Sequence, residues 1–161
     1  MDKVSASSYK SPLHICLFQP EIPQNTGNIG RLSLATGSVL HLIKPIGFSL
    51  NDYYLKRAGL DYWEYVDLRI HDSFADCLGS FPEKPRMAFL STKAEKSLWE
   101  MPELDLLVFG RETSGLPDSF REQYPDSFYK IPMFHEKVRS LNLATSAGIS
   151  VYEQLRWRAI S

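Results

Sequence analysis

The stretch from residue 131 to residue 152, IPMFHEKVRSLNLATSAGISVY, changes character midway. Pro132 ends a strand-like run, because proline has no N–H for a central ladder. A charged loop follows, and Ser140 or Asn142 can then cap the first N–H groups of a helix. That helix is rich in small residues such as Gly148, which let another backbone approach closely. This order suits a ligand seated against the loop and the helix start, and it also suits a surface loop before a packed helix.

Length and composition indicate one globular domain. The chain has 161 residues, of which 43% are hydrophobic and 23% charged, as in ordinary folded proteins. We expect a flexible tail at residues 1–11 and a single domain at residues 12–161. The sequence has neither an apolar run long enough to span a membrane nor the apolar core of a signal peptide. We therefore expect a cytoplasmic protein without a membrane partner.

Charge and cysteine content bear on nucleic-acid binding and on the redox state of the thiols. The net charge of −1 does not by itself indicate a nucleic-acid binder. From Lys130 onward, however, five Lys or Arg stand against two acidic residues, and such a local field can hold phosphates. Cys16 and Cys77 are far apart in the sequence, so we expect reduced thiols in the core.

Strand-like and helix-like segments alternate along the chain. Strands are predicted at Leu13–Phe18, Val39–Ile43, Glu64–Ile70, Arg86–Leu90, Asp105–Phe109 and Phe128–Ile131. Helices are predicted at residues 28–36, 51–59, 72–78, 118–124 and 142–157. This alternation predicts an α/β fold with a mostly parallel sheet covered by helices on both faces.

Three loops that leave strand ends carry unusual polar residues. They span Glu21–Arg31, Gly110–Pro117 and Pro132–Asn142. In open α/β sheets, ligands bind beyond the carboxyl ends of the strands. We therefore expect these loops to form the functional site.

Several common sites are absent from the sequence. There is no Gly-x-Gly-x-x-Gly fingerprint, no Walker A sequence and no Gly-x-Ser-x-Gly elbow. The histidines have no metal-ligand spacing with one another or with the cysteines, so we expect structural or surface histidines and no metal site. They are His14, His41, His71 and His135.

Taken together, the three loops resemble the signature motifs of the SPOUT superfamily of RNA methyltransferases. The motif residues are Asn25–Leu32, Phe109–Pro117, and Ile131–Met133 with Ser140–Ala144. They are most similar to the small branch of tRNA (cytidine/uridine-2′-O)-methyltransferases that act at the wobble position. The resemblance covers nearly the whole chain after the tail.

The resemblance implies a fold, a methyl donor and partners. It implies a C-terminal deep trefoil knot, an obligate homodimer and a tRNA substrate. It also implies that S-adenosylmethionine binds among the knot loops and leaves as S-adenosylhomocysteine, with no metal. Tight passage of the chain through the knot would explain the small residues Ala144, Ala147 and Gly148.

The resemblance also assigns roles to individual residues. Gly110 is expected to leave room for the ligand, and Arg31 is expected to act either as a general base or as a clamp that orients the ribose and stabilises charge. The donor pocket corresponds to Leu90, Gly110, Ile131, Ser140 and Leu141. The catalytic polar residues correspond to Asn25, Arg31, Glu112, Ser140 and Asn142. Candidate RNA contacts are Lys137, Arg139, Tyr152 and Arg156.

Two other functions fit the same motifs. One keeps the reaction but changes the substrate to another RNA such as ribosomal RNA. The other is a noncatalytic dimer that binds RNA or an adenosyl ligand. The presence of all five catalytic polar residues favours an enzyme, because a binding protein would not need them together.

Overall fold

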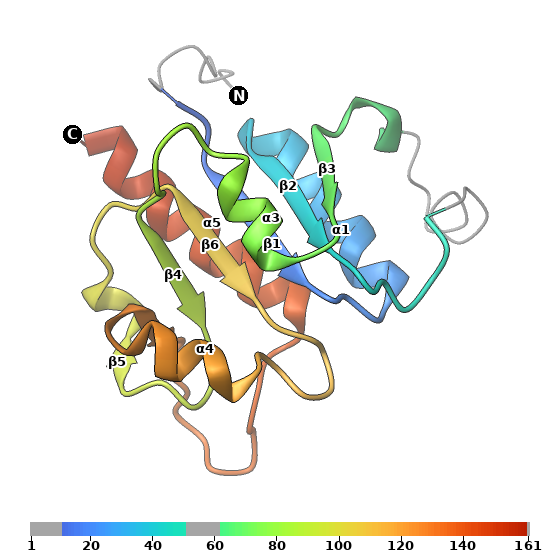
Figure 1. The fold of residues 1–161 in the computed structure, drawn as a ribbon. Helices are drawn as coiled ribbons and strands as arrows, with labels where there is room; N and C mark the ends of the chain where they lie inside the picture. Colours follow the sequence, from blue (N-terminus) through green and yellow to red (C-terminus); the bar gives the residue numbers. More distant parts are fainter. Residues whose placement is uncertain (1–10, 51–61, 161) are drawn as a thin grey trace.

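The computed structural model describes residues 11–50 and 62–160. Its centre is a sheet in the order β3-β2-β1-β6-β4-β7-β5, in which neighbouring strands are parallel (Figure 1). The strands are β1 (His14–Phe18), β2 (Val39–Ile43), β3 (Leu68–His71), β4 (Met87–Leu90), β5 (Lys96–Ser97), β6 (Leu106–Phe109) and β7 (Phe128–Lys130). The helices are α1 (Pro23–Thr36), α3 (Phe74–Gly79), α4 (Asp118–Gln123) and α5 (Leu143–Ile160), with 3₁₀ turns η2 (Trp63–Tyr65), η3 (Leu98–Glu100) and η4 (Pro125–Ser127).

Helices cover both faces of this sheet, as the sequence predicts. On one face, α1 and α5 pack against a buried apolar cluster that includes Ile15, Leu40 and Leu107. On the other face, α3 and α4 cover a second cluster rich in aromatic rings, including Phe74 and Phe89. Among the described residues, no helix is long and apolar enough to cross a membrane. The helix expected at residues 51–59 and the expected tail, except Ser11, lie outside the described residues.

The first helix begins earlier than predicted. The sequence indicates a loop as far as Gly27, but α1 starts at Pro23 and places Asn25 inside the helix. Proline suits the first turn, because its fixed φ is helical and its missing N–H would have no helical partner there. The N–H groups just before the helix are bound by Glu112, far away in the sequence. Local pattern therefore could not show that a helix begins here.

Three further elements differ from the prediction. Strand β3 begins at Leu68 rather than Glu64, because Trp63–Tyr65 forms a 3₁₀ turn. Strand β5 and turn η3 were not predicted at all. A two-residue strand has no readable period, and β5 exists only because it pairs with β7.

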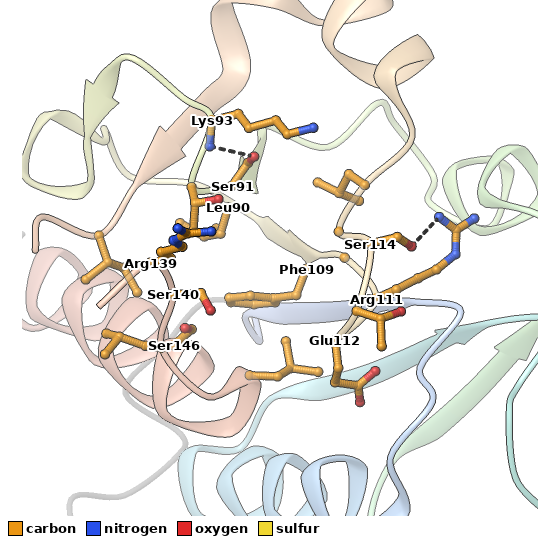
Figure 2. Close-up of a pocket in the computed structure, with 18 of the residues that line it drawn as sticks. Leu90, Ser91, Lys93, Phe109, Arg111, Glu112, Ser114, Arg139, Ser140 and Ser146 are labelled. Carbon is orange, nitrogen blue, oxygen red and sulfur yellow. Dashed lines mark hydrogen bonds between the residues drawn. The ribbon is translucent and has the colours of Figure 1, made fainter. Parts of the chain in front are cut away.

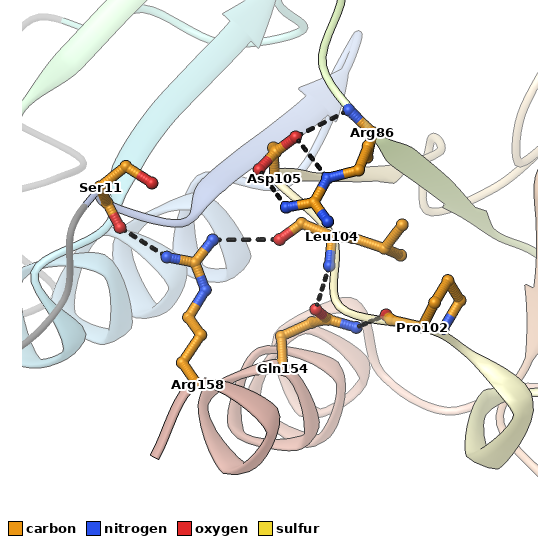
Figure 3. A network of polar contacts seen from close by, with 7 residues as sticks. All are labelled: Ser11, Arg86, Pro102, Leu104, Asp105, Gln154 and Arg158. Atoms are coloured by element: carbon orange, nitrogen blue, oxygen red, sulfur yellow. Dashed lines mark hydrogen bonds and ion pairs between the residues drawn. The ribbon is translucent and has the colours of Figure 1, made fainter. Parts of the chain in front are cut away.

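The last helix is held by polar contacts from its buried side. Gln154 is fully buried, accepts a hydrogen bond from the Leu104 N–H at 2.7 Å and donates to the Pro102 carbonyl at 2.9 Å (Figure 3). Arg158 donates to the carbonyls of Leu104 and Ser11. These bonds fasten α5 to the segment that leads into β6.

The small residues of α5 do not share one role. Ala147 is fully buried and packs in the core between helix and sheet. A Cβ added at Gly148, by contrast, would meet no heavy atom within 4 Å. Close passage of the chain therefore does not explain Gly148 among the described residues, and that part of the expectation is wrong.

Candidate functional site

The expected loops meet around one cavity of about 710 Å³ beside the carboxyl ends of β4, β6 and β7 (Figure 2). In Figure 2, Arg139 and Ser140 lie on one wall, Arg111 and Glu112 on the opposite wall, and the Phe109 ring between them. The cavity brings together the whole predicted donor pocket and most of the predicted catalytic residues. The predicted residues that line it are Asn25, Leu90, Gly110, Glu112, Ile131, Arg139, Ser140, Leu141 and Asn142.

Asn142 joins the two helices that start at the cavity. Its side-chain oxygen accepts hydrogen bonds from the N–H groups of Ala144 at 2.8 Å and Thr145 at 3.3 Å, which makes it the cap of α5. Its side-chain nitrogen donates to Asn25 Oδ1 at 3.0 Å. The sequence left Ser140 and Asn142 as alternative caps, and the cap is Asn142. One amide thus fixes the position of α1 relative to α5.

Glu112 and Glu21 make a reciprocal clamp between the Gly110–Pro117 loop and α1. The Glu112 carboxylate accepts from the N–H groups of Glu21 at 2.9 Å and Ile22 at 3.1 Å. In return, the Thr113 N–H and hydroxyl donate to the Glu21 carboxylate. These bonds from Thr113 lower the pKa of the Glu21 carboxyl. Both carboxylates are therefore occupied in holding backbone.

Gly110 is required by its own loop. An added Cβ would lie 2.4 Å from the Gly115 carbonyl carbon and 2.5 Å from the Leu116 nitrogen, which are backbone atoms that cannot swing away. Arg111 and Gly115 are hydrogen-bonded to each other across this narrow turn. Crowding of the ligand was the expected reason for a glycine here, and the first obstacle is instead the facing backbone.

Other cavity residues were given no individual role by the sequence interpretation. Arg111 donates to Gln19 Oε1 at 2.8 Å, and its guanidinium lies 4.9 Å from the centroid of the Phe18 ring. The loop after β4 also reaches the cavity, and its position after a strand end was the signal that could have found it. The lining residues without a predicted role include Ser91, Thr92, Lys93, Arg111, Thr113, Ser114, Arg121, Met133 and Ser146, of which Ser91, Thr92, Lys93, Arg121 and Ser146 lie outside the expected loops.

Four predicted site residues do not line the cavity. Arg31 is exposed on α1, with its guanidinium 5.6 Å from the centroid of the Tyr62 ring. Lys137 is exposed in the loop before α5. Tyr152 and Arg156 are exposed on α5, and Arg156 pairs with Glu153 at 2.7 Å. Any role of these residues at the cavity needs a second molecule.

The histidines form a group that their sequence spacing did not indicate. Three of them lie in a hydrogen-bonded row across the sheet, with distances of 2.8 Å between His14 and His41 and 2.9 Å between His41 and His71. His41 is fully buried, as expected of a structural histidine. Cys77 lies beside His41 and His71, so three potential metal ligands come together in space although their sequence spacing does not indicate it. Both cysteines are free and buried, as predicted.

The chemistry of the cavity favours a nucleoside-sized ligand. Its volume is within the roughly 300 to 1,000 Å³ of small-molecule sites. Apolar side chains of Leu90, Phe109 and Leu141 lie beside exposed polar groups of the turning loops. The Glu112 carboxylate is already bound to backbone N–H groups, so the other polar side chains of the lining remain for recognition.

Comparison with known proteins places this arrangement in a family. Residues 12–152 match the model of the SpoU rRNA Methylase family. The chain belongs to this family. The match spans β1 to α5 and includes every loop that lines the cavity, so it agrees with the resemblance drawn from the motifs.

Relatives of this SpoU methylase are similar over nearly their whole length. The tRNA (cytidine(34)-2′-O)-methyltransferase of Methylovorus glucosotrophus is 48% identical, covering 89% of this chain and 93% of the relative. The protein of the same name from Acidovorax is 43% identical, with 90% of each chain covered. A solved structure, described as giving insights into 2-OH methylation of C/U34 on tRNA, is 47% identical with a TM-score of 0.86, covering 96% of this chain and 99% of the other.

Proposed function

We propose that this SpoU methylase transfers a methyl group to the ribose 2′-hydroxyl of cytidine or uridine at position 34 of tRNA. One observation carries the proposal: the three motif loops enclose one cavity in a chain that is 48% identical to a protein named for this reaction. S-adenosylmethionine would supply the methyl group and leave as S-adenosylhomocysteine. A protein of the same fold, AviRb of Streptomyces viridochromogenes, was solved in complex with AdoMet, at 20% identity and a TM-score of 0.79.

The cavity residues support binding of this donor. Leu90, Gly110, Ile131 and Leu141 line the cavity from the end of β4 and from the loops that follow β6 and β7. Main-chain N–H and C=O groups of such segments can recognise adenine and ribose without adding a cation next to the sulfonium. Arg111, the cation of the nearest loop, is held by Gln19 and lies over Phe18. The Arg111 guanidinium therefore already interacts with Gln19 and the Phe18 ring.

Positioning is the main contribution of the polar residues. Methyl transfer needs the 2′-oxygen in line with the methyl group, and holding reactants in that geometry removes much of the barrier. The Asn25–Asn142 bond and the Glu112 clamp fix the relative positions of α1, α5 and the Gly110–Pro117 loop. We therefore assign Asn25, Asn142 and Glu112 mainly to orienting the site. Ser140 also lines the cavity, two residues before the helix cap Asn142.

Arg31 acts across a dimer in this proposal. A guanidinium stays protonated at neutral pH, which favours a clamp on phosphate and developing charge over a general base. Arg31 lies outside the cavity of its own chain, on the outer side of α1. The partner's cavity is therefore where it would contact the substrate.

An exposed apolar surface supports the homodimer. The outer sides of α1 and α5 expose Leu34 and Ile149 at 39% each and Tyr152 at 58%. Gly148 lies on the same side of α5 and leaves open space for a close neighbour. A two-fold pair would bury this surface. Leu155 and Trp157 on α5 are already partly buried, so they contribute less to such a surface. Sedimentation showing only monomer at micromolar concentration would contradict the dimer.

The trefoil knot remains part of the proposal. The chain leaves β7 near the β5 edge of the sheet, yet α5 returns to pack against α1 and β6. Gln154 and Arg158 lie under the segment that leads into β6. Such a return beneath an earlier segment is what threading of the C-terminal part through a loop requires.

Two exposed aromatic rings mark an RNA surface beside the cavity. Trp99 is 64% exposed and Phe134 is 87% exposed, with ring centroids 6.4 Å apart and planes inclined by 27°. Phe134 belongs to the loop that carries Lys137 and the cavity residue Arg139. Unpaired bases stack on such rings, and cations hold the phosphates between them. Tyr152 and Arg156 lie instead on the α5 surface assigned to the dimer.

Transfer to tRNA with nucleoside mapping tests the proposed function. The full-length chain, labelled S-adenosylmethionine and bulk tRNA should give 2′-O-methylcytidine or 2′-O-methyluridine at position 34. A matched reaction with ribosomal RNA should give none. Methylation of a base, or of ribosomal RNA alone, would contradict the proposed substrate. Donor binding by calorimetry without transfer to any RNA would instead indicate a noncatalytic binding protein.

A further inference from the structure

A row of histidines lies on the sheet face opposite α1 and α5. The strand register pairs Cys16 with His41 and Ile43 with His71, which puts these side chains on the same face. His41 Nδ1 and His71 Nε2 are 2.9 Å apart, and His41 Nε2 is 2.8 Å from His14 Nδ1. None of these residues lines the methyl-transfer cavity. The row is therefore a separate polar group inside an otherwise apolar layer.

Helix α3 places a thiol over this row. One ring nitrogen of His41, one of His71 and the Cys77 sulfur lie within 4.8 Å of one another. His41 and Cys77 are fully buried, whereas His71 on the edge strand is partly exposed. Two imidazoles and one thiol around a single point form a donor set typical of transition-metal sites.

We propose that His41, His71 and Cys77 bind a divalent zinc-type ion. The ion would bind between His41 Nδ1 and His71 Nε2, and the proton of their hydrogen bond would move to the other nitrogen of the same ring, so that both imidazoles bind as neutral ligands. The Cys77 thiol would lose its proton to solvent and bind as the thiolate. Because His71 is partly exposed, the ion can enter from the β3 edge, and water can fill the fourth position.

The required rearrangement is small. Tetrahedral zinc with bonds of about 2.0 Å to nitrogen and 2.3 Å to sulfur separates two nitrogens by about 3.3 Å and a nitrogen from the sulfur by about 3.5 Å. The two imidazoles must therefore open by a few tenths of an ångström from their 2.9 Å contact. The Cys77 sulfur must approach by at most about 1.3 Å from the 4.8 Å limit of the group, a displacement on the scale of a side-chain rotation.

The surroundings already hold the ligands in binding form. Histidine ligands usually donate their other N–H to an acceptor, and His41 Nε2 faces His14 Nδ1 at 2.8 Å in that way.

Cobalt(II) titration of the chelator-stripped full-length chain tests this site. We expect one equivalent of Co²⁺ to produce a sulfur-to-cobalt charge-transfer band and tetrahedral d–d bands, and Zn²⁺ to displace it. Cys77→Ala should lose the sulfur band, and His71→Gln should weaken binding at least tenfold. His135→Gln, which changes an exposed histidine outside the group, should bind like the wild type.

Two further measurements keep the result interpretable. Circular dichroism of each variant shows whether it is folded, and His71→Gln at the sheet edge provides a second variant should Cys77→Ala unfold. Zn²⁺ should raise the Tm of the wild type but not of either variant, because an ion that binds only the folded state stabilises it. A wild type without a sulfur band and without a Tm shift overturns the proposal. So does an equal sulfur band in folded Cys77→Ala.

Discussion

Two groups of polar side chains in this SpoU methylase differ in what they bind. At the strand ends, Asn142 and Glu112 bind backbone N–H groups and so hold loops and helices around a cavity. Beneath α3, His14, His41 and His71 bind one another and hold no loop. At the strand ends, local geometry therefore depends on single side chains. The histidine row adds stability to a sheet whose strands are already paired. Changes at the strand ends should therefore affect activity first, and changes in the histidine row should affect stability first.

The largest effect is expected at Gly110. Gly110→Ala puts a Cβ 2.4 Å from facing backbone, so the turn to Gly115 must open. We expect donor binding to be lost, measured by calorimetry with S-adenosylhomocysteine. Gly79→Ala is the matched control, because a Cβ there meets nothing within 4 Å. Unchanged binding by Gly110→Ala would show that the cavity tolerates a different loop.

Arg31 tests whether the strand-end group is complete within one chain. Arg31→Ala should reduce transfer on the order of 100-fold, as the loss of a charge-stabilising group does, and leave donor affinity near that of the wild type. The transfer rate of Arg31→Lys should fall less than that of Arg31→Ala. It should not rise more steeply with pH than the wild-type rate. A steeper rise for the lysine variant would instead indicate a general base.

Mixed dimers separate action within one subunit from action across two. Arg31→Ala refolded with Gly110→Ala should recover about a quarter of the wild-type rate, because half of the random dimers then contain one intact site. If Arg31 served its own chain's cavity, every mixed dimer would still lack a complete site. The mixture would then stay inactive.

Asn142 tests the dependence of the cavity on a single side chain. Asn142→Ala removes the cap of α5 and the bond to Asn25, and should cost about 1 kcal/mol of unfolding free energy. Asn142→Asp keeps an acceptor for the helix N–H groups but cannot donate to Asn25. We expect transfer to fall at least tenfold in both variants, with stability lost mainly in the alanine variant. Denaturant unfolding and single-turnover rates measure the two effects separately.

His14 tests whether the histidine row affects stability rather than activity. His14→Ala leaves the buried His41 ring without one partner and should cost about 1 to 3 kcal/mol of unfolding free energy. Transfer per folded molecule should stay near that of the wild type, since the row is outside the cavity. Urea unfolding with chelator present, together with rates at saturating donor, would check this. A loss of rate larger than the loss of folded protein would contradict the separation of the two groups.

The smallest effect is expected from the Glu21 carboxylate. Its folded-state pKa is lowered below the ordinary 4.5 by hydrogen bonds from Thr113, so the unfolded state binds more protons in that range. The stabilisation is therefore present above about pH 4.5 and is lost as the pH falls through the folded-state pKa. Glu21→Gln should be slightly less stable at pH 7, and its difference from the wild type should shrink in acid. Thermal unfolding at a series of pH values measures this difference.

Local sequence features predicted much of the fold. Strands β1, β2, β4 and β6 appear within a residue of their expected starts, because each is a short apolar run bounded by a charged residue, proline or glycine. The α5 cap and the strand-end loops could also be predicted, because capping and turn chemistry depend on neighbouring residues. The start of α1 could not be predicted, since the N–H groups just before it are bound by the distant Glu112.

The sequence by itself determined the alternation of strands and helices, the three motif loops and the family to which they point. These features depend on residues within about one turn or one strand of each other. Only the tertiary structure decided that Arg31 lies outside its own cavity and that His41, His71 and Cys77 converge. The physical reason is register: parallel pairing and helix packing bring together side chains about thirty residues apart, and no local spacing encodes that contact.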